Sequence, residues 1–371
     1  MRSNYKSIFI ITICVVIIFI ISFINYYNNK NQIMMLTKIK DEAITRPFIV
    51  DINCLENLSN GRNCTYPILV AIQNSYSQKP NETIKIKYLL NSSEEKDFWL
   101  FQDINNSTTQ IATKRYQLIL SKMANVDMPK DWKSFAKDWK NGKYFKCTPL
   151  LERPKDVKRV IPIKFTERLY EFSELLNKYN ATAFLLGGTL LGWVRECSII
   201  PHTGDTDMGI FSEEHSEALL RAILTSKVFK IYWVLGRLKN SFELSVFVDG
   251  FKIDLFYLYK SKENASVNGM RSWVKQRLRW NYPKLSGEIC AAELHGKLFH
   301  VLCDYQKIIE SDYGIEGWKK DFDTENYVWD RDVKNQEDME IYSDSEWPDV
   351  YHIGFDINKV EEWINSINKT I

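Results

Sequence analysis

Three aspartates form the pattern in this sequence with the clearest chemical meaning. Asp205 and Asp207 flank Thr206, and Asp254 lies in the otherwise apolar segment FKIDLFYLY. On a strand, residues 205 and 207 project from the same face, so their carboxylates stand side by side. Like charges at that range disfavour joint ionisation, and a hard divalent cation, Mg²⁺ or Mn²⁺, resolves the conflict. The pattern predicts a metal site of Asp205 and Asp207 with Asp254 as its third acid, since a charge in an apolar strand is costly unless it faces a functional site.

Two adjacent glycines accompany these acids. Gly187 and Gly188 follow the apolar run TAFLL and precede TLLGWVR, which is predicted to be a short helix. Glycine backbone can approach a ligand closely, and a helix N-terminus can receive phosphate oxygens. A double-glycine turn, a D-x-D strand and a later single-Asp strand together indicate phosphoryl transfer. In that chemistry the glycines hold phosphates and the carboxylates hold a metal that neutralises developing charge.

The elements that must position these residues follow from periodicity. Apolar residues recur at helical spacing over 163–179, which predicts an amphipathic helix. DMGIF is a predicted strand, and a helix with Ser212 as its N-cap follows it. KIYWVLG, FELSVFV and FKIDLFYLY then form a run of strands. Helices alternating with strands and followed by this run predict a mixed α+β sheet.

The region before this domain has a different pattern. From residue 46 to about 121, short apolar or alternating runs such as YPILVAI and TIKIKYLL are separated by turns rich in Asn and Ser. We therefore expect a small β-rich domain at 46–150, in which no chemical motif is present, and a second domain at 151–371.

The N-terminus predicts membrane attachment. Residues 8–24 read IFIITICVVIIFIISFI, without charge or proline, which is near the lower end of the roughly 17–25 residues that span a bilayer. Arg2 and Lys6 precede this run, so a tail at 1–7 is expected to stay cytoplasmic and the rest to be luminal. Residues 25–45 are a predicted stalk. A cleaved signal peptide is the alternative.

Sequons, cysteines and charge agree with a luminal body. The sequons begin at Asn57, Asn63, Asn81, Asn91, Asn105, Asn106, Asn180, Asn264 and Asn368. Six cysteines follow the apolar run, an even number compatible with disulfides in an oxidising compartment. A net charge of +2 gives no indication of nucleic-acid binding.

Cys290 and Cys303 flank a predicted hairpin around His295 and Gly296. A two-residue loop would place Cys290 opposite Val301, whereas a four-residue loop would place it opposite Cys303. A disulfide and a pair of free thiols both remain open at this point.

A family resemblance covers about residues 163–350. LLGGTLLGWVRECSIIPHTGDTDMGIF is similar to the signature block of the fukutin and LicD family, which has G-T-x-L-G-W-x-R, then I-P and D-x-D. FELSVFVDGFKIDLFYLY and KLFHVLCDYQKIIESDYGIEGW resemble further blocks of its fukutin members, as do VWDRD and SEWPDV. LicD-type members often carry extra acids before the D-x-D, and this chain instead has PHTG at 201–204.

The resemblance implies a fold and roles for residues. The fold is that of polymerase-β-like nucleotidyltransferases. Gly187, Gly188 and Thr189 are expected near the donor phosphates, and Asp205, Asp207 and Asp254 are expected to be catalytic and to bind metal. Arg195 has two interpretations, a phosphate or nucleotide contact or a salt bridge that fixes the short helix.

The resemblance also implies an activity. Family members transfer a phospho-alcohol from a CDP-activated donor, so this chain is expected to transfer a ribitol 5-phosphate-like group to a glycan. The cofactors are then Mg²⁺ or Mn²⁺, with a CDP-alcohol as cosubstrate. The expected location is the Golgi or endoplasmic reticulum membrane, as a single-pass type II protein that acts on glycoproteins or glycolipids, alone or with other glycosyltransferases. The alternatives are a phosphocholine transferase and a non-catalytic luminal protein that binds glycans or assists a glycosyltransferase.

Other residues carry weaker signals. The basic run at 271–279, with Trp273 inside it and Trp280 next to it, is more typical of a solvated helix face than of an anion-binding surface. His202 is interpreted as a loop histidine rather than a proton shuttle, and Trp329 as a packing residue. Asp330 has no assigned role.

Overall fold

The computed structural model describes residues 48–49, 51–62, 69–72, 86–89, 99–103, 109–112, 117–120, 127–140, 142–321 and 327–368. The predicted anchor at 8–24 and the stalk at 25–45 lie outside them. In the part of the chain that is described, no helix is long and apolar enough to cross a bilayer. The chain divides into two compact units, Met1–Ser107 with Lys114–Phe135 and Thr108–Thr113 with Ala136–Ile371.

The first unit contains a mixed sheet and a short helix. The sheet order is β6-β7-β1-β2-β3-β4, with parallel pairs β1–β7 and β2–β3 and antiparallel pairs elsewhere. The helix α2 (Ile52–Ser59) begins at Asp51, whose side chain accepts a hydrogen bond from the backbone of Cys54 at 3.0 Å. The strands are β1 (Phe48–Ile49), β2 (Leu69–Ile72), β3 (Ile86–Leu89), β4 (Trp99–Asp103), β6 (Leu118–Leu120) and β7 (Asp127–Pro129).

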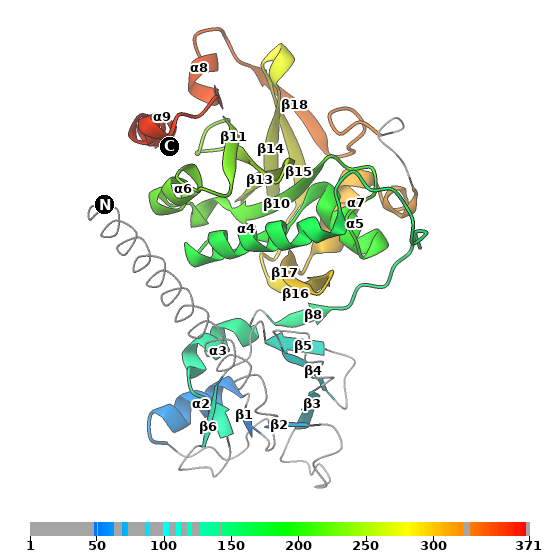
Figure 1. Ribbon diagram of the computed structural model, residues 1–371, viewed down its shortest axis with the longest axis vertical. Coiled ribbons are helices and arrows are strands. Elements are labelled where there is room, and N and C mark those ends of the chain that lie inside the picture. Colours follow the sequence, from blue (N-terminus) through cyan, green and yellow to red (C-terminus); the bar gives the residue numbers. More distant parts are fainter. Residues whose placement is uncertain are drawn as a thin grey trace, which may run out of the picture. The chain divides into compact units, whose positions relative to one another are not determined.

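The second unit is built on a larger mixed sheet (Figure 1). Its order is β19-β11-β12-β13-β10-β9-β17-β16-β8-β5, with parallel pairs at β10–β13, β9–β17 and β16–β8. The strands are β5 (Thr109–Ala112), β8 (Lys143–Phe145), β9 (Phe184–Leu185), β10 (Asp205–Phe211), β11 (Lys230–Leu235), β12 (Glu243–Val248), β13 (Phe251–Lys260), β16 (Ile289–Leu294), β17 (Lys297–Leu302) and β19 (Tyr351–Ile353). The mixed α+β architecture predicted from periodicity is confirmed.

A second, antiparallel sheet begins at the C-terminal end of β13. Tyr259 and Lys260 pair with β14 (Asn264–Arg271), which pairs with β15 (Gln276–Pro283), which pairs with β18 (Gln336–Ile341). The long strand β13 therefore belongs to both sheets.

Helices pack on these sheets and complete the core. The predicted amphipathic helix forms as a 3₁₀ turn at Ile163–Phe165 followed by α4 (Thr166–Lys178), and its residues Leu169, Phe172 and Leu176 are fully buried. In α6 (Glu217–Leu224) the cap is Ser216, which accepts a hydrogen bond from Leu219. The prediction of Ser212 as the cap was wrong, because Ser212 instead opens a separate 3₁₀ turn. The remaining helices are α3 (Trp132–Lys140), α5 (Gly187–Glu196), α7 (Tyr305–Tyr313), α8 (Trp347–Val350) and α9 (Val360–Asn368).

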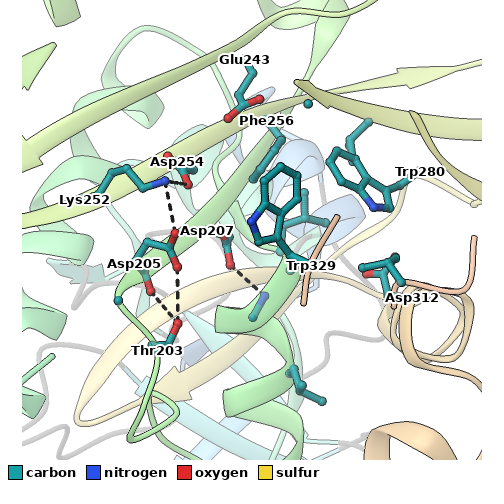
Figure 2. A pocket seen from close by; sticks show the side chains of 18 of the residues that line it. Thr203, Asp205, Asp207, Glu243, Lys252, Asp254, Phe256, Trp280, Asp312 and Trp329 are labelled. Carbon is teal, nitrogen blue, oxygen red and sulfur yellow. Dashed lines mark hydrogen bonds and ion pairs between the residues drawn. The ribbon is translucent and has the colours of Figure 1, made fainter. Parts of the chain in front are cut away.

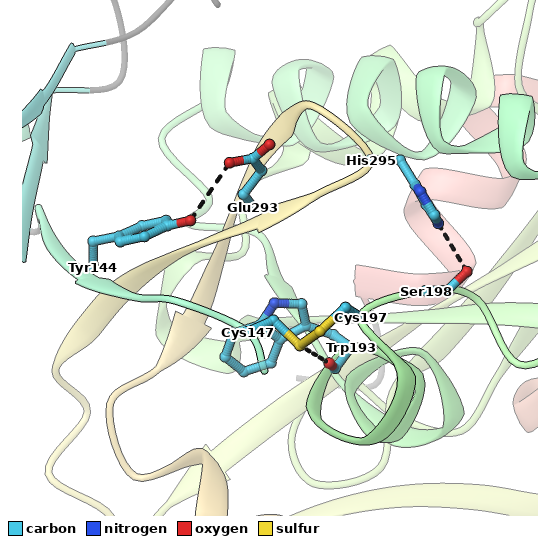
Figure 3. The surroundings of a disulfide bond; sticks show 7 residues. All are labelled: Tyr144, Cys147, Trp193, Cys197, Ser198, Glu293 and His295. Carbon is cyan, nitrogen blue, oxygen red and sulfur yellow. Dashed lines mark hydrogen bonds between the residues drawn. A yellow bond between two sulfur atoms is a disulfide. The ribbon is translucent and has the colours of Figure 1, made fainter. Parts of the chain in front are cut away.

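Two disulfides tie the second unit together. Cys147 bonds to Cys197, which joins the segment after β8 to the end of α5 (Figure 3). Cys290 bonds to Cys303, although the hairpin has the two-residue loop in which Cys290 lies opposite Val301. His295 and Gly296 both have positive φ, as this tight turn requires. The Cα atoms of Cys290 and Cys303 are 5.1 Å apart, within bonding range, although the two residues are diagonal neighbours in the hairpin rather than directly opposed.

Candidate active site

The parallel pairing of β10 with β13 brings the predicted acids together. Asp207 lies directly beside Asp254 in the register, and Asp205 lies beside Lys252. Residues two apart on a strand share a face, so three carboxylates and one ammonium gather on one side of the sheet (Figure 2). Because the paired residues are 47 positions apart in sequence, only the fold can create this cluster.

Lys252 is the cation of the cluster. Its Nζ lies 2.7 Å from an oxygen of Asp254 and 3.2 Å from one of Asp205, and 4.8 Å from the centre of the Trp233 ring. Burial by itself would lower the pKa of Lys252, but Asp254 and Asp205 outweigh it and raise that pKa above its ordinary value. The lysine therefore stays charged and offsets part of the negative charge around it.

The double-glycine turn is bonded to Asp207. The Gly188 N–H donates to Oδ2 of Asp207 at 2.8 Å, and the backbone N–H of Asp207 donates to the Thr189 hydroxyl at 2.7 Å. Gly187 has φ of +51°, and a Cβ there would lie 2.8 Å from Oδ2 of Asp207. Glycine is thus required at 187 both for its backbone conformation and for the close approach of the carboxylate.

Burial and mutual repulsion shape the acids. Burial, followed by the charges of Asp205 and Asp254, raises the pKa of Asp207 well above its usual range. Burial also raises the pKa of Asp254 to about 6, opposed by Lys252 and by the hydroxyl of Ser245, which donates to Asp254. These shifts mark a site where negative charge is held in excess of local positive charge.

A cavity of about 470 Å³ opens beside the cluster. One side is polar and consists of the glycine turn, the three aspartates, Lys252 and Glu243. The other side is aromatic, and Asp312 lies on its wall (Figure 2). The aromatic lining residues are Trp233, Phe256, Trp280, Tyr282, Tyr313, Tyr327 and Trp329. Burial raises the pKa of Asp312 to about 7, although hydrogen bonds from Asn335 and Tyr282 oppose the shift.

Two known protein families match two different segments of the chain. Residues 180–286 match the family described as LicD/FKTN/FKRP, nucleotidyltransferase domain, and residues 33–146 match the W02B3.4-like N-terminal domain. The uncharacterized protein W02B3.4 of Caenorhabditis elegans is 32% identical over 290 residues, which are 75% of this chain and 72% of the relative. The chain belongs to the LicD/FKTN/FKRP family.

Two further relatives show how far the similarity extends. The uncharacterized protein T07A5.1 of Caenorhabditis elegans is 33% identical over 237 residues, or 62% of each chain. The human ribitol-5-phosphate transferase FKTN is 26% identical over 238 residues, which are 62% of this chain and 50% of the relative. This LicD/FKTN/FKRP member thus spans only half the length of that relative.

Within this family member, two of the predicted site residues lie away from the cavity surface. Thr189 is buried and bonded to the backbone of Asp207. Arg195 is fully buried at the end of α5, where its guanidinium pairs with Glu196 at 2.9 Å and donates to the carbonyl of Lys320 at 2.7 Å. The structure therefore shows the salt bridge, the second of the two interpretations of Arg195.

The basic run at 271–279 was predicted as a helix face, and this prediction was wrong. These residues lie in the β14–β15 hairpin, with a short 3₁₀ turn at Ser272–Val274. Their partners are acids in or near β18, the strand that pairs with β15, and Arg279 lies directly opposite Glu337 in that ladder. The ion pairs are Arg271–Asp330, Arg271–Asp338, Lys275–Asp344, Arg277–Glu340 and Arg279–Glu337.

Sequence reasoning missed several lining residues. Lys252 precedes Asp254 by two positions in the same strand, and Glu243 lies in another apolar strand. A charged residue within an apolar strand is costly unless it is compensated, and this could have identified both. Trp329 and His202, interpreted as packing and loop residues, both line the cavity.

The oxygens of Asp205, Asp207 and Asp254 are the ligands that could hold a divalent cation here. Their chemistry fits such an ion, since the cluster already draws a cationic ammonium between Asp205 and Asp254. In the described residues no group of three or more acids, histidines or cysteines is arranged to hold a metal as it stands. Lys252 would have to move aside for a metal to bind between these carboxylates.

Proposed function

We propose that this protein transfers a phospho-alcohol of the ribitol 5-phosphate type from a CDP-activated donor to a glycan hydroxyl. The observation that carries the proposal is the position of Asp207, which lies beside Asp254 in the strand register and is bonded to the Gly188 N–H in the lining of a cavity. Membership of a family that includes proteins named ribitol-5-phosphate transferase supports it.

In the proposed reaction, the oxygen of a glycan hydroxyl attacks the phosphorus that carries the alcohol. The new phosphorus–oxygen bond forms as the bond to the CMP oxygen breaks, so the products are a phosphodiester-linked glycan and CMP. Asp205 and Asp207 would hold Mg²⁺ or Mn²⁺, which when bound neutralises charge on the transferred phosphate. Asp254 completes the ligand set or accepts the hydroxyl proton, and its raised pKa of about 6 suits the second role.

The glycine turn has a positioning role in this proposal. Gly188 fixes Asp207 through its N–H, and its helix α5 starts at the cavity wall with its N-terminus toward the acids. The partial positive charge of a helix N-terminus favours phosphate oxygens. The same turn therefore orients an acid and offers a place for donor phosphates.

The test is release of CMP from a panel of CDP-alcohols by the purified protein, with and without a glycan acceptor. We expect CMP release from CDP-ribitol to depend on the acceptor and on a divalent cation. A wild-type protein that releases no CMP from any donor, although it binds glycan, would support the non-catalytic alternative instead.

We also propose that the described units lie in the lumen of the Golgi or endoplasmic reticulum, attached through residues 8–24. The disulfides Cys147–Cys197 and Cys290–Cys303 favour an oxidising compartment, and the sequon residues Asn180 and Asn264 are exposed. Endoglycosidase treatment should lower the apparent mass of the expressed protein. Absence of that shift, together with digestion by protease added to the cytoplasmic side, would refute the topology.

A further inference from the structure

Glu243 is a further acid of the cavity and has no assigned role in the transfer reaction. It lies on β12 beside Phe256 of β13 and two residues before Ser245, which contacts Asp254. The side chain is nine-tenths buried, with the residue 5% exposed, and its carboxylate borders the cavity (Figure 2). Glu243 thus lies between the acid cluster and the aromatic wall.

The carboxylate of Glu243 lacks a partner. Among the residues that the structure describes, none donates a hydrogen bond to it and none forms an ion pair with it. A buried acceptor without a donor is costly, and such groups in native proteins commonly await water or a ligand. Because Glu243 lines the cavity, a donor on a ligand in the cavity can reach it.

The Trp280 ring and the carboxyl group of Glu243 both lie close to Gly269, where the absence of a side chain leaves room for them. A Cβ at Gly269 would lie 2.6 Å from the Trp280 ring and 3.4 Å from Oε2 of Glu243. Trp280 is also 6.0 Å from Trp329, centre to centre, and Trp329 is 46% exposed. The site therefore offers a buried carboxyl group, whose pKa burial and the nearby Asp254 raise well above its ordinary value, beside an aromatic surface that extends to solvent.

We propose that Glu243 and Trp280 form a hydroxyl-recognition subsite for a polyol or sugar. The hydroxyl groups of such a ligand donate to the carboxylate of Glu243, and its carbon–hydrogen face packs on Trp280. The assignment rests on the proposed function for the position of the reacting phosphate at the aspartates. The hydroxylated group belongs to the donor's alcohol or to the acceptor glycan, and the test separates these two sources.

A quaternary ammonium fits this subsite less well, although aromatic rings also bind such cations. It has no N–H or O–H, so the Glu243 oxygens would remain without a hydrogen bond. A site built to bond a hydroxyl discriminates strongly against an analogue without one, because its buried polar group is left unpaired.

The experiment compares the full-length wild type with Glu243→Gln and Trp280→Phe. Glu213→Gln is the matched control, because Glu213 is 54% exposed, pairs with Lys260 and lies outside the cavity lining. Calorimetric titration would use CDP, CDP-ribitol, CDP-choline and the acceptor glycan. Unchanged affinity for CDP shows that each variant is folded.

If the donor's alcohol occupies the subsite, Glu243→Gln should weaken CDP-ribitol binding about tenfold or more and leave CDP binding unchanged. If the acceptor occupies it, only glycan affinity and the KM for glycan should change. The subsite is overturned if Glu243→Gln alters neither, or if it weakens CDP-choline as much as CDP-ribitol. A folded wild type that binds no hydroxylated ligand overturns it as well.

Failure of the proposed function is a separate result. In that case the wild type releases no CMP and binds no CDP derivative. Glycan binding that is lost in Glu243→Gln but kept in Glu213→Gln would then still support the hydroxyl subsite.

Discussion

Lys252 should be the residue whose loss most disturbs the metal-free site. Its ammonium contacts Asp254 at 2.7 Å and Asp205 at 3.2 Å, and the side chains of Lys252 and Asp254 are only 19% and 6% exposed. Replacing it by methionine keeps the length of the side chain and removes the charge. The carboxylates then face one another without compensation, and breaking a largely buried pair in this way costs about 3–5 kcal/mol.

The loss should be visible as a lower melting temperature. For a domain of this size, about 1 kcal/mol corresponds to roughly 2–4 °C, so Lys252→Met should melt about 6–20 °C below the wild type at pH 7.5. Lys260→Met is the control, because Lys260 lies on the same strand and pairs with the half-exposed Glu213. We expect that exposed pair to contribute at most about 1 kcal/mol.

The sign of the pH dependence gives a second check. The pKa of Asp254 is raised to about 6 in the folded protein. A carboxyl with a raised folded pKa contributes stability that is fully present below its unfolded pKa and is lost as pH rises through the folded value. Stability linked to Asp254 should therefore fall between about pH 4 and pH 6. In Lys252→Met the fall should continue above pH 6, since the opposing ammonium is gone.

Metal addition completes the test. If Lys252 offsets charge that a divalent cation would otherwise offset, Mn²⁺ should raise the melting temperature of Lys252→Met more than that of the wild type. A variant that melts like the wild type at pH 7.5, or whose deficit is equal at pH 4 and pH 7.5, would refute the assigned role of Lys252.

Three other outcomes are expected. Asp207→Asn should lower transfer at least about 100-fold, because a metal ligand supplies several kcal/mol of charge stabilisation, and CMP release at matched folding measures it; near-normal turnover contradicts the assignment. Gly187→Ala should impair transfer and destabilise the protein by about 1–2 kcal/mol from its φ of +51° alone, whereas Gly317→Ala, with no atom within 4 Å, should change the melting temperature little; equal effects would exclude the close contact with Asp207. Replacing Cys290 and Cys303 by alanine opens a loop with a sequence separation of 13 and should cost roughly 2–3 kcal/mol under oxidising conditions, measured by thermal melting; an unchanged melting temperature argues against the bridge.

Local patterns predicted much of the second unit. The helical spacing of Phe165, Leu169, Phe172 and Leu176 gave α4, because an amphipathic helix buries one face. The apolar runs gave β10 to β13 for the corresponding reason in strands. The hairpin at 271–279 was misassigned because a count of basic residues took precedence over the period-two alternation of Arg277 and Arg279, which places both on one face of β15.

The candidate site was predictable only in its acids. Asp205 and Asp207 share a face by local geometry, so their proximity followed from the sequence. The contact of Asp207 with Asp254 requires the parallel pairing of β10 and β13, and the approach of Glu243 to Trp280 requires β12, β14 and β15 together. Such pairings join segments far apart in the chain, and single-sequence periodicity does not contain their register.

Lys252 and Glu243 are two charged residues of the site that the sequence analysis did not single out, although the sequence contained a signal for both. Each lies in a strand whose other residues are mostly apolar, and burying a charge there is unfavourable unless something compensates it. Lys252 is compensated inside the protein by Asp254 and Asp205. Glu243 has no hydrogen-bond or ion-pair partner among the described residues, burial raises its pKa well above the ordinary value, and its carboxyl group borders the cavity. A charged residue in an apolar strand therefore had two different meanings in this protein. Lys252 is an internal counter-charge, and Glu243 is a group that faces the ligand cavity.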